Sequence, residues 1–256
     1  MFDLSGKRGL ITGGGSGIGK AVAKTFIQAG ASVAIADIQF PGEVAESIGA
    51  LALQCDVSDE TGVLDAFNTA RAGLGGPLDF VILNAGVGDV GPPLTAQPIE
   101  LLEKVTRINY WGTVHGLKHA PTVMVDGGAI VSTSSMAAFI NIPGSAAYSA
   151  SKKAITSLTE MSALELGTRG IRVNCICPGY TETSMGSGDE GKQLCEAFTA
   201  LGRVATVDDM TGVFHFLISD ASRYITGQAI KVDGGWSCGP TPALLSIITG
   251  STQAPS

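Results

Sequence analysis

Short apolar runs alternate along the chain with longer stretches of helical spacing. The apolar runs predict strands at residues 8–12, 31–36, 50–55, 80–83, 129–132, 172–176 and 229–232. The stretches between them predict helices at residues 17–29, 60–73, 101–120, 147–167 and 207–218. Most of these strands are almost continuously apolar, which is typical of strands covered on both faces. The pattern predicts one doubly wound α/β domain over residues 1–235, with a parallel sheet of about seven strands, helices on both faces, and a C-terminal extension over residues 236–256.

Composition narrows the class of protein. Apolar residues make up 45% of the 256 residues and charged residues 15%, which a disordered chain would not show. Acidic residues outnumber basic ones, 23 against 16, and the net charge is −7. Nucleic acids and anionic membranes both select a basic face. We therefore expect neither as a partner, and expect a small-molecule ligand instead.

The cysteines and histidines offer no clear metal site. The five cysteines lack the paired spacing of a zinc or redox site: Cys55, Cys175, Cys177, Cys195 and Cys238. We expect reduced thiols in a cytoplasmic protein, since no apolar leader is evident and no apolar run reaches the ~20 residues that span a bilayer. His115 and His119 are four residues apart, as metal ligands can be, but no further ligand accompanies them. We expect them in the core or at an interface, and expect no bound metal.

A glycine-rich turn follows the first predicted strand and precedes a helix. Glycines let a backbone approach a pyrophosphate, and the N–H groups of a helix N-terminus favour its negative charge. The candidate residues of this turn are Gly13, Ser16, Gly17, Ile18 and Gly19. Their spacing differs from the usual GxGxxG, and a glycine turn alone is also compatible with a flexible link.

Asp37 strengthens the case for a dinucleotide. It ends the second predicted strand, 18 residues after Gly19, where a carboxylate can accept hydrogen bonds from ribose hydroxyls. Its charge would repel the 2′-phosphate of NADP, and the neighbouring Ile38 and Gln39 offer no basic replacement. The sequence therefore favours NAD over NADP.

Tyr148 and Lys152 lie four residues apart at the start of a predicted helix, so both side chains emerge on one face. A free phenol has a pKa of about 10 and is a poor base near neutrality. A nearby ammonium favours the phenolate and lowers that pKa. The pair is a candidate for acid–base chemistry, although an isolated YxxxK pair is usually an ordinary surface pair.

Further motifs occur together with this pair: Thr12-Gly13 with Gly17 and Gly19, Asp56-Val57, Asn84-Ala85-Gly86, Asn109, Ser134-Ser135, Pro178-Gly179 and Asp233-Gly234-Gly235. In this order they resemble the short-chain dehydrogenase/reductase family over residues 7–235. The resemblance implies a Rossmann-type fold, an oxidoreductase that uses a nicotinamide cofactor, and a homotetramer or homodimer.

The resemblance implies a role for each residue of the catalytic set. Ser135 would hold the substrate oxygen, with Ser134 as the alternative if the register differs by one. Tyr148 would take the hydroxyl proton of an alcohol, or return it during reduction. Lys152 would tune Tyr148 and bind the nicotinamide ribose. The backbone carbonyl of Asn109 would hold a water in a proton relay to the lysine.

The resemblance also implies where the cofactor lies. Asp56 would meet the adenine amino group, and the backbone of Val57 would meet the ring edge. The segment from Pro178 onward would fix the nicotinamide amide. The other positions that the family uses for its cofactor are Asn84, Ala85, Gly86, Gly179, Thr181 and Thr183, with Tyr148 and Lys152.

The substrate is expected to be apolar. The candidate lining residues are Val87, Val90, Ala137, Ile142, Tyr180, Met185 and Phe198. They favour a hydrophobic, cyclic or aromatic alcohol over a charged acid. The segment between Thr183 and Leu201 is rich in Gly and Ser and is expected to be a mobile substrate cover. Residues 243–248 form an apolar run, which we expect to pack on a neighbouring subunit.

These observations predict an enzyme that transfers a hydride between NAD and a secondary alcohol or ketone. The alternative is a catalytically silent NAD-binding sensor or scaffold, since a fold does not establish an activity. The presence of Asn109, Ser135, Tyr148 and Lys152 together argues against it. An epimerase or dehydratase is disfavoured by the chain length, because such relatives usually carry an added substrate domain.

Overall fold

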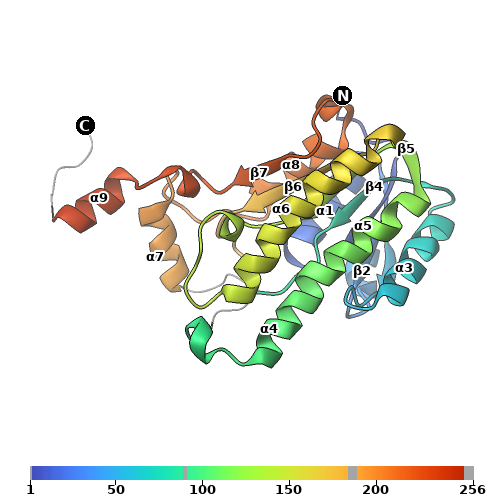
Figure 1. Cartoon of the computed structure of the whole chain (residues 1–256). Coiled ribbons are helices and arrows are strands. Elements are labelled where there is room, and N and C mark those ends of the chain that lie inside the picture. Colours follow the sequence, from blue (N-terminus) through green and yellow to red (C-terminus); the bar gives the residue numbers. More distant parts are fainter. Residues whose placement is uncertain (1, 89–90, 184–188, 251–256) are drawn as a thin grey trace.

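The computed structural model describes residues 2–88, 91–183 and 189–250 (Figure 1). Within them, seven strands form one parallel sheet in the order β3-β2-β1-β4-β5-β6-β7. Their bounds are β1 (Arg8–Thr12), β2 (Ser32–Asp37), β3 (Leu51–Gln54), β4 (Leu78–Leu83), β5 (Met124–Thr133), β6 (Arg172–Pro178) and β7 (Ala229–Val232). The strand order reverses between β1 and β4, the point at which doubly wound sheets bind ligands. The predicted fold class is confirmed.

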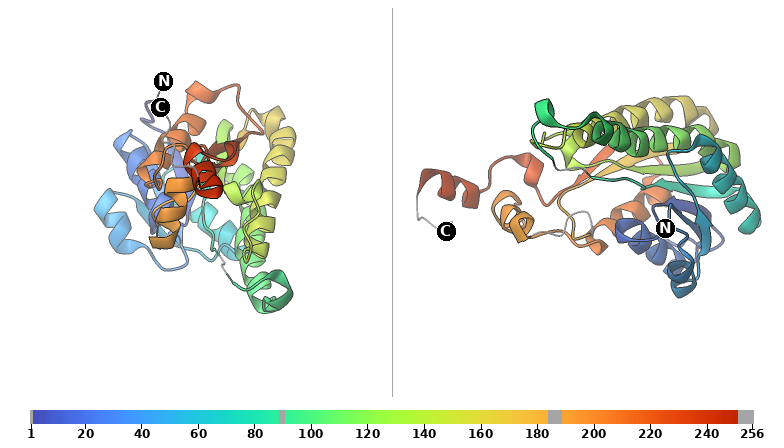
Figure 2. Two further views of the ribbon diagram at one scale, coloured as in Figure 1. Left: turned by 90° about the vertical axis from the view of Figure 1, so that its left-hand side faces the viewer. Right: turned by 90° about the horizontal axis from the view of Figure 1, so that it is seen from below.

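Helices cover both faces of the sheet, as Figure 2 shows. On one face lie α1 (Gly17–Gln28), α2 (Gly42–Ile48) and α8 (Asp208–Ile218). On the other lie α3 (Glu60–Gly73), α5 (Gly112–Val123) and α6 (Ala146–Leu166). Each layer buries one set of alternating strand side chains, so the sheet has an apolar core on each side.

Neighbouring residues of the central strands show this alternation. Leu10 and Val81 belong to the core under α3, α5 and α6. Ile11 and Ile82 belong to the core under α1, α2 and α8. All four side chains are fully buried. A strand that is buried on both faces is mostly apolar along its length, which explains the apolar runs in the sequence.

One predicted helix has a different structure. The helix expected over residues 101–120 begins as α4 (Ile99–Val105), continues through a π-turn (Thr106–Trp111) and ends as α5 at Val123. A π-turn contains one residue more than the corresponding α-helical turns and is often found at functional sites. Here it contains the buried Asn109.

Other differences concern short elements. β5 begins five residues before its predicted start, and β3 is one residue shorter at each end than the predicted 50–55. Three helices were not predicted: α2, α7 (Asp189–Phe198) and α9 (Pro242–Thr249). Within the predicted substrate cover after Thr183, residues 189–198 form helix α7, and residues 184–188 lie outside the described residues. The mobility of this cover stays a prediction. In α9, the Thr241 hydroxyl accepts a hydrogen bond from the N–H of Leu244, which caps the helix.

The carboxyl ends of the parallel strands meet at one edge of the sheet. α7 and α9 lie beyond this edge, and α9 projects from the body of the molecule (Figures 1 and 2). The predicted site residues occur at the same edge, in the segments that follow the strands. In the described part of the chain, no helix combines the length and the apolar character that a membrane span requires.

Candidate active site

The glycine turn between β1 and α1 is shaped to hold an anion. Gly17 has φ +51°, a left-handed conformation that favours glycine. A Cβ on Gly19 would lie 2.2 Å from the carbonyl oxygen of Gly13, so the turn can pack this closely only without that side chain. The Ser16 side chain caps none of the first-turn amides, no acidic residue lies there, and Ile18 packs against the core. The N–H groups at this helix end are therefore available to a pyrophosphate.

Asp37 ends β2 beside this turn. Its Oδ2 atom accepts a hydrogen bond from the N–H of Gly15 at 3.0 Å. Among the described residues only Oδ2 is bonded, which leaves Oδ1 for a ligand. The next side chain, Ile38, is 58% exposed and offers an apolar surface at the same edge.

The loop after β3 carries Asp56 and Val57. The Oδ1 atom of the exposed Asp56 accepts a hydrogen bond from the N–H of Ser58 at 2.9 Å. Val57 is buried, and its carbonyl oxygen lies 2.9 Å from Nδ1 of His115. Because Gln54 pairs with Asp37 across β3 and β2, the structure brings this loop to the edge where Asp37 lies.

Asn84 joins the ends of three strands. Its Nδ2 atom donates to the carbonyl oxygens of Thr12 at 3.3 Å and of Gly13 at 3.2 Å. Its Oδ1 atom accepts from the hydroxyl of Thr133 at 3.1 Å. The Thr12 hydroxyl in turn accepts from the N–H groups of Asn84 and Ala85, at 3.1 and 3.2 Å. These bonds fix the glycine turn relative to β4 and β5.

Asn109 projects from the π-turn onto the segment after β4. Its Oδ1 atom accepts from the N–H of Val87 at 2.8 Å, and its Nδ2 atom donates to the Val87 carbonyl at 2.9 Å. Nδ2 also lies 3.2 Å from the hydroxyl of Ser151 in α6. The backbone carbonyl of Asn109 accepts from the Thr113 hydroxyl at 2.8 Å.

Lys152 is buried beneath the same edge. Its Nζ atom donates to the carbonyl oxygen of Thr133 at 2.9 Å and lies 5.6 Å from the centre of the Tyr148 ring. Burial lowers the pKa of Lys152 to about 8, because removal from water disfavours the charged amine. A Cβ on Gly86 would lie 3.2 Å from Nζ, so this glycine leaves space beside the ammonium. The arrangement places a cation and a phenol together in a poorly hydrated site.

Ser134 and Ser135 differ in what their hydroxyls contact. The Ser134 hydroxyl donates to the carbonyl oxygen of Lys152 at 2.7 Å and so ties β5 to α6. The Ser135 oxygen accepts from the N–H of Ala137 at 3.1 Å. A hydroxyl that accepts this bond keeps its own hydrogen for another acceptor. The geometry favours Ser135 over Ser134 as the residue that holds a substrate oxygen.

The segment after β6 runs from the sheet toward the glycine turn. Pro178 ends β6, and the N–H of Gly179 donates to the carbonyl of Val232 in β7 at 2.9 Å. At the other end, the Thr183 side chain lies close to Gly17: a Cβ added to Gly17 would be in van der Waals contact with Cγ2 of Thr183, at 3.5 Å. The segment therefore spans the region between the catalytic edge and the anion-binding turn.

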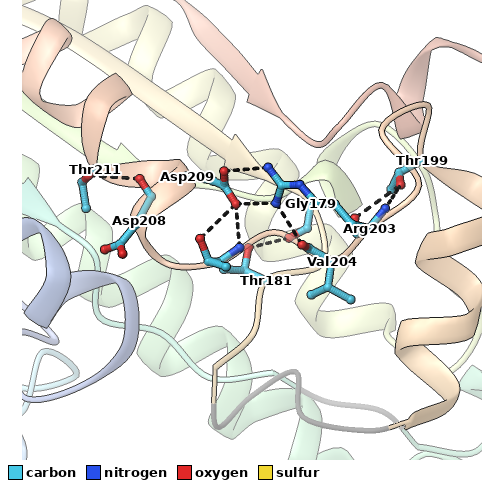
Figure 3. Close-up of polar contacts among 9 residues, drawn as sticks. Gly179, Thr181, Thr199, Arg203, Val204, Asp208, Asp209 and Thr211 are labelled. Carbon is cyan, nitrogen blue, oxygen red and sulfur yellow. Dashed lines mark hydrogen bonds and ion pairs between the residues drawn. The ribbon is translucent and has the colours of Figure 1, made fainter.

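This segment is paired with the chain that leads into α8. Thr181 and Ala205 form a parallel bridge. In it, the N–H of Glu182 donates to the carbonyl of Ala205 at 2.8 Å, and the N–H of Ala205 donates to the carbonyl of Tyr180 at 3.1 Å. The Thr181 hydroxyl donates to the carbonyl of Gly179 at 3.1 Å (Figure 3).

An ion pair with two hydrogen bonds stabilises the segment around Ala205, which is the residue that pairs with Thr181 (Figure 3). The Arg203 guanidinium donates to both carboxylate oxygens of Asp209, at 2.7 and 2.9 Å. One of these oxygens also accepts from the N–H and the hydroxyl of Thr206, at 2.7 and 3.0 Å. These bonds hold the pKa of Asp209 well below its usual range. The ion pair closes the turn over residues 203–209. This turn contains Ala205, so the pair also helps to fix the position of Thr181.

Comparison with known proteins identifies this arrangement. A family model described as enoyl-(acyl carrier protein) reductase matches residues 13–237. Mitochondrial borneol dehydrogenase of Lavandula x intermedia is 38% identical over 242 residues, 91% of this chain and 92% of that protein. The 2,5-dichloro-2,5-cyclohexadiene-1,4-diol dehydrogenase of Sphingobium indicum is 34% identical over 249 residues, covering 93% and 99%. A short-chain type dehydrogenase/reductase structure from Mycobacterium marinum matches with a TM-score of 0.87 at 36% identity, covering 93% and 98%.

The chain is a short-chain dehydrogenase/reductase. As a member of this family, it is an oxidoreductase that acts on CH–OH groups with a nicotinamide cofactor. The resemblance inferred from the sequence motifs is confirmed.

The candidate substrate residues of the dehydrogenase follow β4, β5 and β6. Val90 and Met185 lie outside the described residues. Of the others, Ala137 is buried, Ile142 is exposed, and Val87, Tyr180 and Phe198 are half-buried. Phe198 stacks on Trp236, with ring centres 5.2 Å apart. This stack joins α7 to the segment after β7 and adds apolar surface beyond the catalytic edge.

Two residues of the dehydrogenase site were not predicted. Thr133 contacts Lys152 through its carbonyl and Asn84 through its hydroxyl. Ser151 accepts from Asn109 and donates to the carbonyl of Tyr148 at 2.8 Å. Both lie next to predicted residues in sequence, and that adjacency is the only signal that the sequence offered for them.

The remaining histidines and cysteines of the dehydrogenase do not gather into a metal site. Within the described ranges, no group of three or more His, Cys, Asp or Glu side chains is placed to hold an ion. His119 lies 3.0 Å from Glu60 at the surface, whereas His115 is buried against Val57. The five cysteines are free, and four of them are buried.

Proposed function

We propose that this protein oxidises a cyclic, apolar secondary alcohol to the ketone with NAD as the hydride acceptor. The observation that carries the proposal is the buried Lys152 ammonium beside Tyr148, in a site where Gly86 has no side chain that would crowd the amine. A buried amine without a carboxylate partner destabilises a fold. Its presence is expected where a reaction needs it.

The residues present fit a dinucleotide. The free first-turn amides of α1 suit a pyrophosphate, and Oδ1 of Asp37 suits the adenosine ribose. The carboxylate of Asp37 disfavours a 2′-phosphate, which supports NAD over NADP. The adenine would lie between Ile38 and the Asp56-Val57 loop. When bound, NAD supplies the atom that accepts the hydride.

Transfer of the substrate's hydroxyl proton is assigned to side chains and backbone groups of the protein. Ser135 would donate a hydrogen bond to the substrate oxygen, and the Tyr148 phenolate would take the hydroxyl proton. Lys152 keeps most of its charge at pH 7, since its pKa is about 8, and so favours that phenolate. Its ammonium has further N–H donors for the ribose hydroxyls of the nicotinamide. The backbone carbonyl of Asn109 would hold the relay water.

The substrate class follows from the lining and from the relatives. The described candidate residues around the site are mostly apolar, and the Phe198–Trp236 stack adds aromatic surface. The two curated relatives described above are named for borneol and for a cyclohexadiene diol. Oxidation is the proposed direction, because an NAD-specific enzyme draws on a mainly oxidised pool.

The test is reduction of NAD, followed at the absorbance band of the reduced nicotinamide, with a panel of cyclic secondary alcohols. Wild-type protein should turn over at least one of them, and NADP should be a poor substitute. Tyr148→Phe keeps the ring but removes the hydroxyl, and should lower kcat by about 10²–10⁴-fold. Turnover that is unaffected by this change would overturn the mechanism, and binding of NAD without any turnover would favour a silent sensor.

Asp37→Ser tests the cofactor preference separately. The substitution removes the charge that would repel a 2′-phosphate, so the ratio of kcat/KM for NADP over NAD should rise by about 10²-fold, about 3 kcal/mol of discrimination. An unchanged ratio would show that Asp37 does not select the cofactor.

We further propose a homotetramer in which the extension reaches a neighbouring subunit. In α9, Leu245, Ile247 and Ile248 are 47%, 69% and 70% exposed. Among the described elements, α7 is the main packing partner of this helix (Figure 1). Removal of residues 239–256 should lower both the oligomer mass and the thermal stability, and no change in either would contradict the proposal. The free thiols support a reducing compartment such as the cytoplasm.

A further inference from the structure

His115 is a buried histidine that the proposed mechanism does not use. It lies in α5, six residues after Asn109, and its Nδ1 atom is 2.9 Å from the carbonyl oxygen of Val57. A carbonyl oxygen only accepts hydrogen bonds, so Nδ1 must carry the hydrogen. The imidazole therefore donates to the backbone of the loop that we assign to adenine.

The peptide between Val57 and Ser58 is held at both of its polar ends. His115 binds its carbonyl oxygen, and Oδ1 of Asp56 accepts from its N–H at 2.9 Å. No acceptor among the described residues is bonded to the N–H of Val57 itself. The Val57–Ser58 peptide of this loop is therefore fixed, and the N–H of Val57, just before it, is available to a ligand.

α5 is built to approach this loop closely. A Cβ on Gly112 would lie 2.8 Å from Cγ2 of Val57, so only glycine allows this contact. Gly112 and His115 are three residues apart and share one helix face. Trp111 stacks on the His115 ring, with centres 6.1 Å apart and an angle of 29° between planes. The ring is held in the orientation that the hydrogen bond needs.

We propose that His115 is a positioning residue for the cofactor, which orients Val57 so that its N–H meets the edge of the adenine ring. The inference rests on the proposed function only in assigning the adenine to the Asp56-Val57 loop. It assigns His115 no part in the proton transfer, which takes place at Tyr148.

His115→Leu and His115→Gln test this role, with His119→Leu as the matched control. Leucine keeps much of the volume but lacks a donor, whereas glutamine retains a side-chain N–H. His119 lies one turn further along the same helix and contacts Glu60 instead of the loop. Calorimetry would measure binding of two probes: ADP-ribose, which contains adenine, and nicotinamide mononucleotide, which does not.

His115→Leu should weaken ADP-ribose binding by about tenfold, as expected for one lost hydrogen bond. It should leave both the binding of nicotinamide mononucleotide and kcat at saturating NAD unchanged. His115→Gln should restore part of the affinity, and His119→Leu should change neither probe. Hydrogen exchange at the Ser58 amide should quicken in folded His115→Leu, and this readout needs no ligand.

Equal weakening of both probes would indicate a general loss of structure and overturn the proposal, as would unchanged ADP-ribose binding. A protein that oxidises no alcohol, yet binds ADP-ribose in a His115-dependent manner, would contradict the proposed function while supporting this inference.

Discussion

The two sides of the active site are fixed by different kinds of contact. Around β4, β5 and α6, the side chains of Asn109 and Lys152 are buried, and each is bonded to a strand end or a loop backbone. After β6, the supporting contact is the ion pair of Arg203 and Asp209, whose side chains are 51% and 32% exposed. Buried hydrogen bonds in a low dielectric are strong, whereas exposed ion pairs are weak and screened by salt.

The difference matches what each side has to do. Proton transfer requires groups held to within a fraction of an ångström, and a buried network provides this precision. The segment after β6 leads toward the region that would cover a substrate, and a cover must open and close during turnover. We expect substitutions on the buried side to change the chemical step, and substitutions at the ion pair to change binding by smaller factors.

The largest effect is expected at Lys152. Lys152→Met keeps the length of the side chain but removes the charge that favours the phenolate, so kcat should fall by about 10²–10⁴-fold. Steady-state kinetics at saturating NAD and alcohol would measure this. A fall confined to KM would contradict a role in the chemical step.

The same variant should be more stable than the wild type. A lowered pKa of about 8 means that the unfolded state binds more protons between about pH 8 and 10.5, so wild-type stability should rise with pH in that window. At pH 7 the buried charge costs about 3 kcal/mol, of which about 1 is offset by the bond to Thr133. Urea unfolding should show Lys152→Met to be more stable by about 2 kcal/mol at pH 7, and the gap should close as the pH approaches 10.5.

Ser135→Ala should have the next largest effect. Loss of a donor to the developing charge on the substrate oxygen typically lowers kcat by about 10²–10³-fold. Ser134→Ala is the control, because the Ser134 hydroxyl bonds the Lys152 carbonyl and should affect stability more than kcat. The reverse result in kinetic and unfolding measurements would move the catalytic role to Ser134.

Gly19→Ala should weaken NAD binding by at least about tenfold, because the new methyl group would displace the Gly13 carbonyl in the pyrophosphate turn. Gly212→Ala in α8 is the matched control, since a Cβ there meets nothing within 4 Å. It should raise stability by about 0.5–1 kcal/mol through helix propensity and leave NAD binding unchanged. Quenching of tryptophan fluorescence during titration with NAD would measure binding, and thermal unfolding would measure stability.

The smallest effect is expected at the ion pair. Arg203→Met and Asp209→Asn should each raise KM by a few-fold with little change in kcat, and the effect should shrink at about 0.5 M salt. Because the pKa of Asp209 is held low, the pair stays charged in mildly acidic buffer, and KM should not respond to Asp209 between about pH 8 and 5. A salt-independent effect would show that the pair acts through packing.

The sequence was informative where one residue type meets one physical requirement. The glycine turn, Asp37 and the Tyr148–Lys152 pair were predicted as site residues from spacing, because helix and strand periods fix which side chains share a face or an edge. The structure brings them to the same edge of the sheet.

The rest depended on tertiary contacts. The apolar spacing over residues 101–120 continues through the π-turn, so nothing in that pattern marks the extra residue at Asn109. The choice between Ser134 and Ser135 rested on the family's register, because adjacent serines look alike in sequence. α2 and α7 are short or begin with turn-forming residues, and their helical structure depends on packing that local composition does not encode.

The helix that runs through the π-turn into α5 cannot easily gain or lose a residue. Asn109 is hydrogen-bonded to Val87, and His115 is hydrogen-bonded to Val57. One continuous helix therefore sets the positions of two loops relative to each other. Six residues separate the two side chains, about 9 Å along the axis. Deleting a single residue between them would rotate one side chain about 100° away from its loop. Among natural variants, insertions and deletions should therefore be tolerated in the surface loops but absent from residues 109–115.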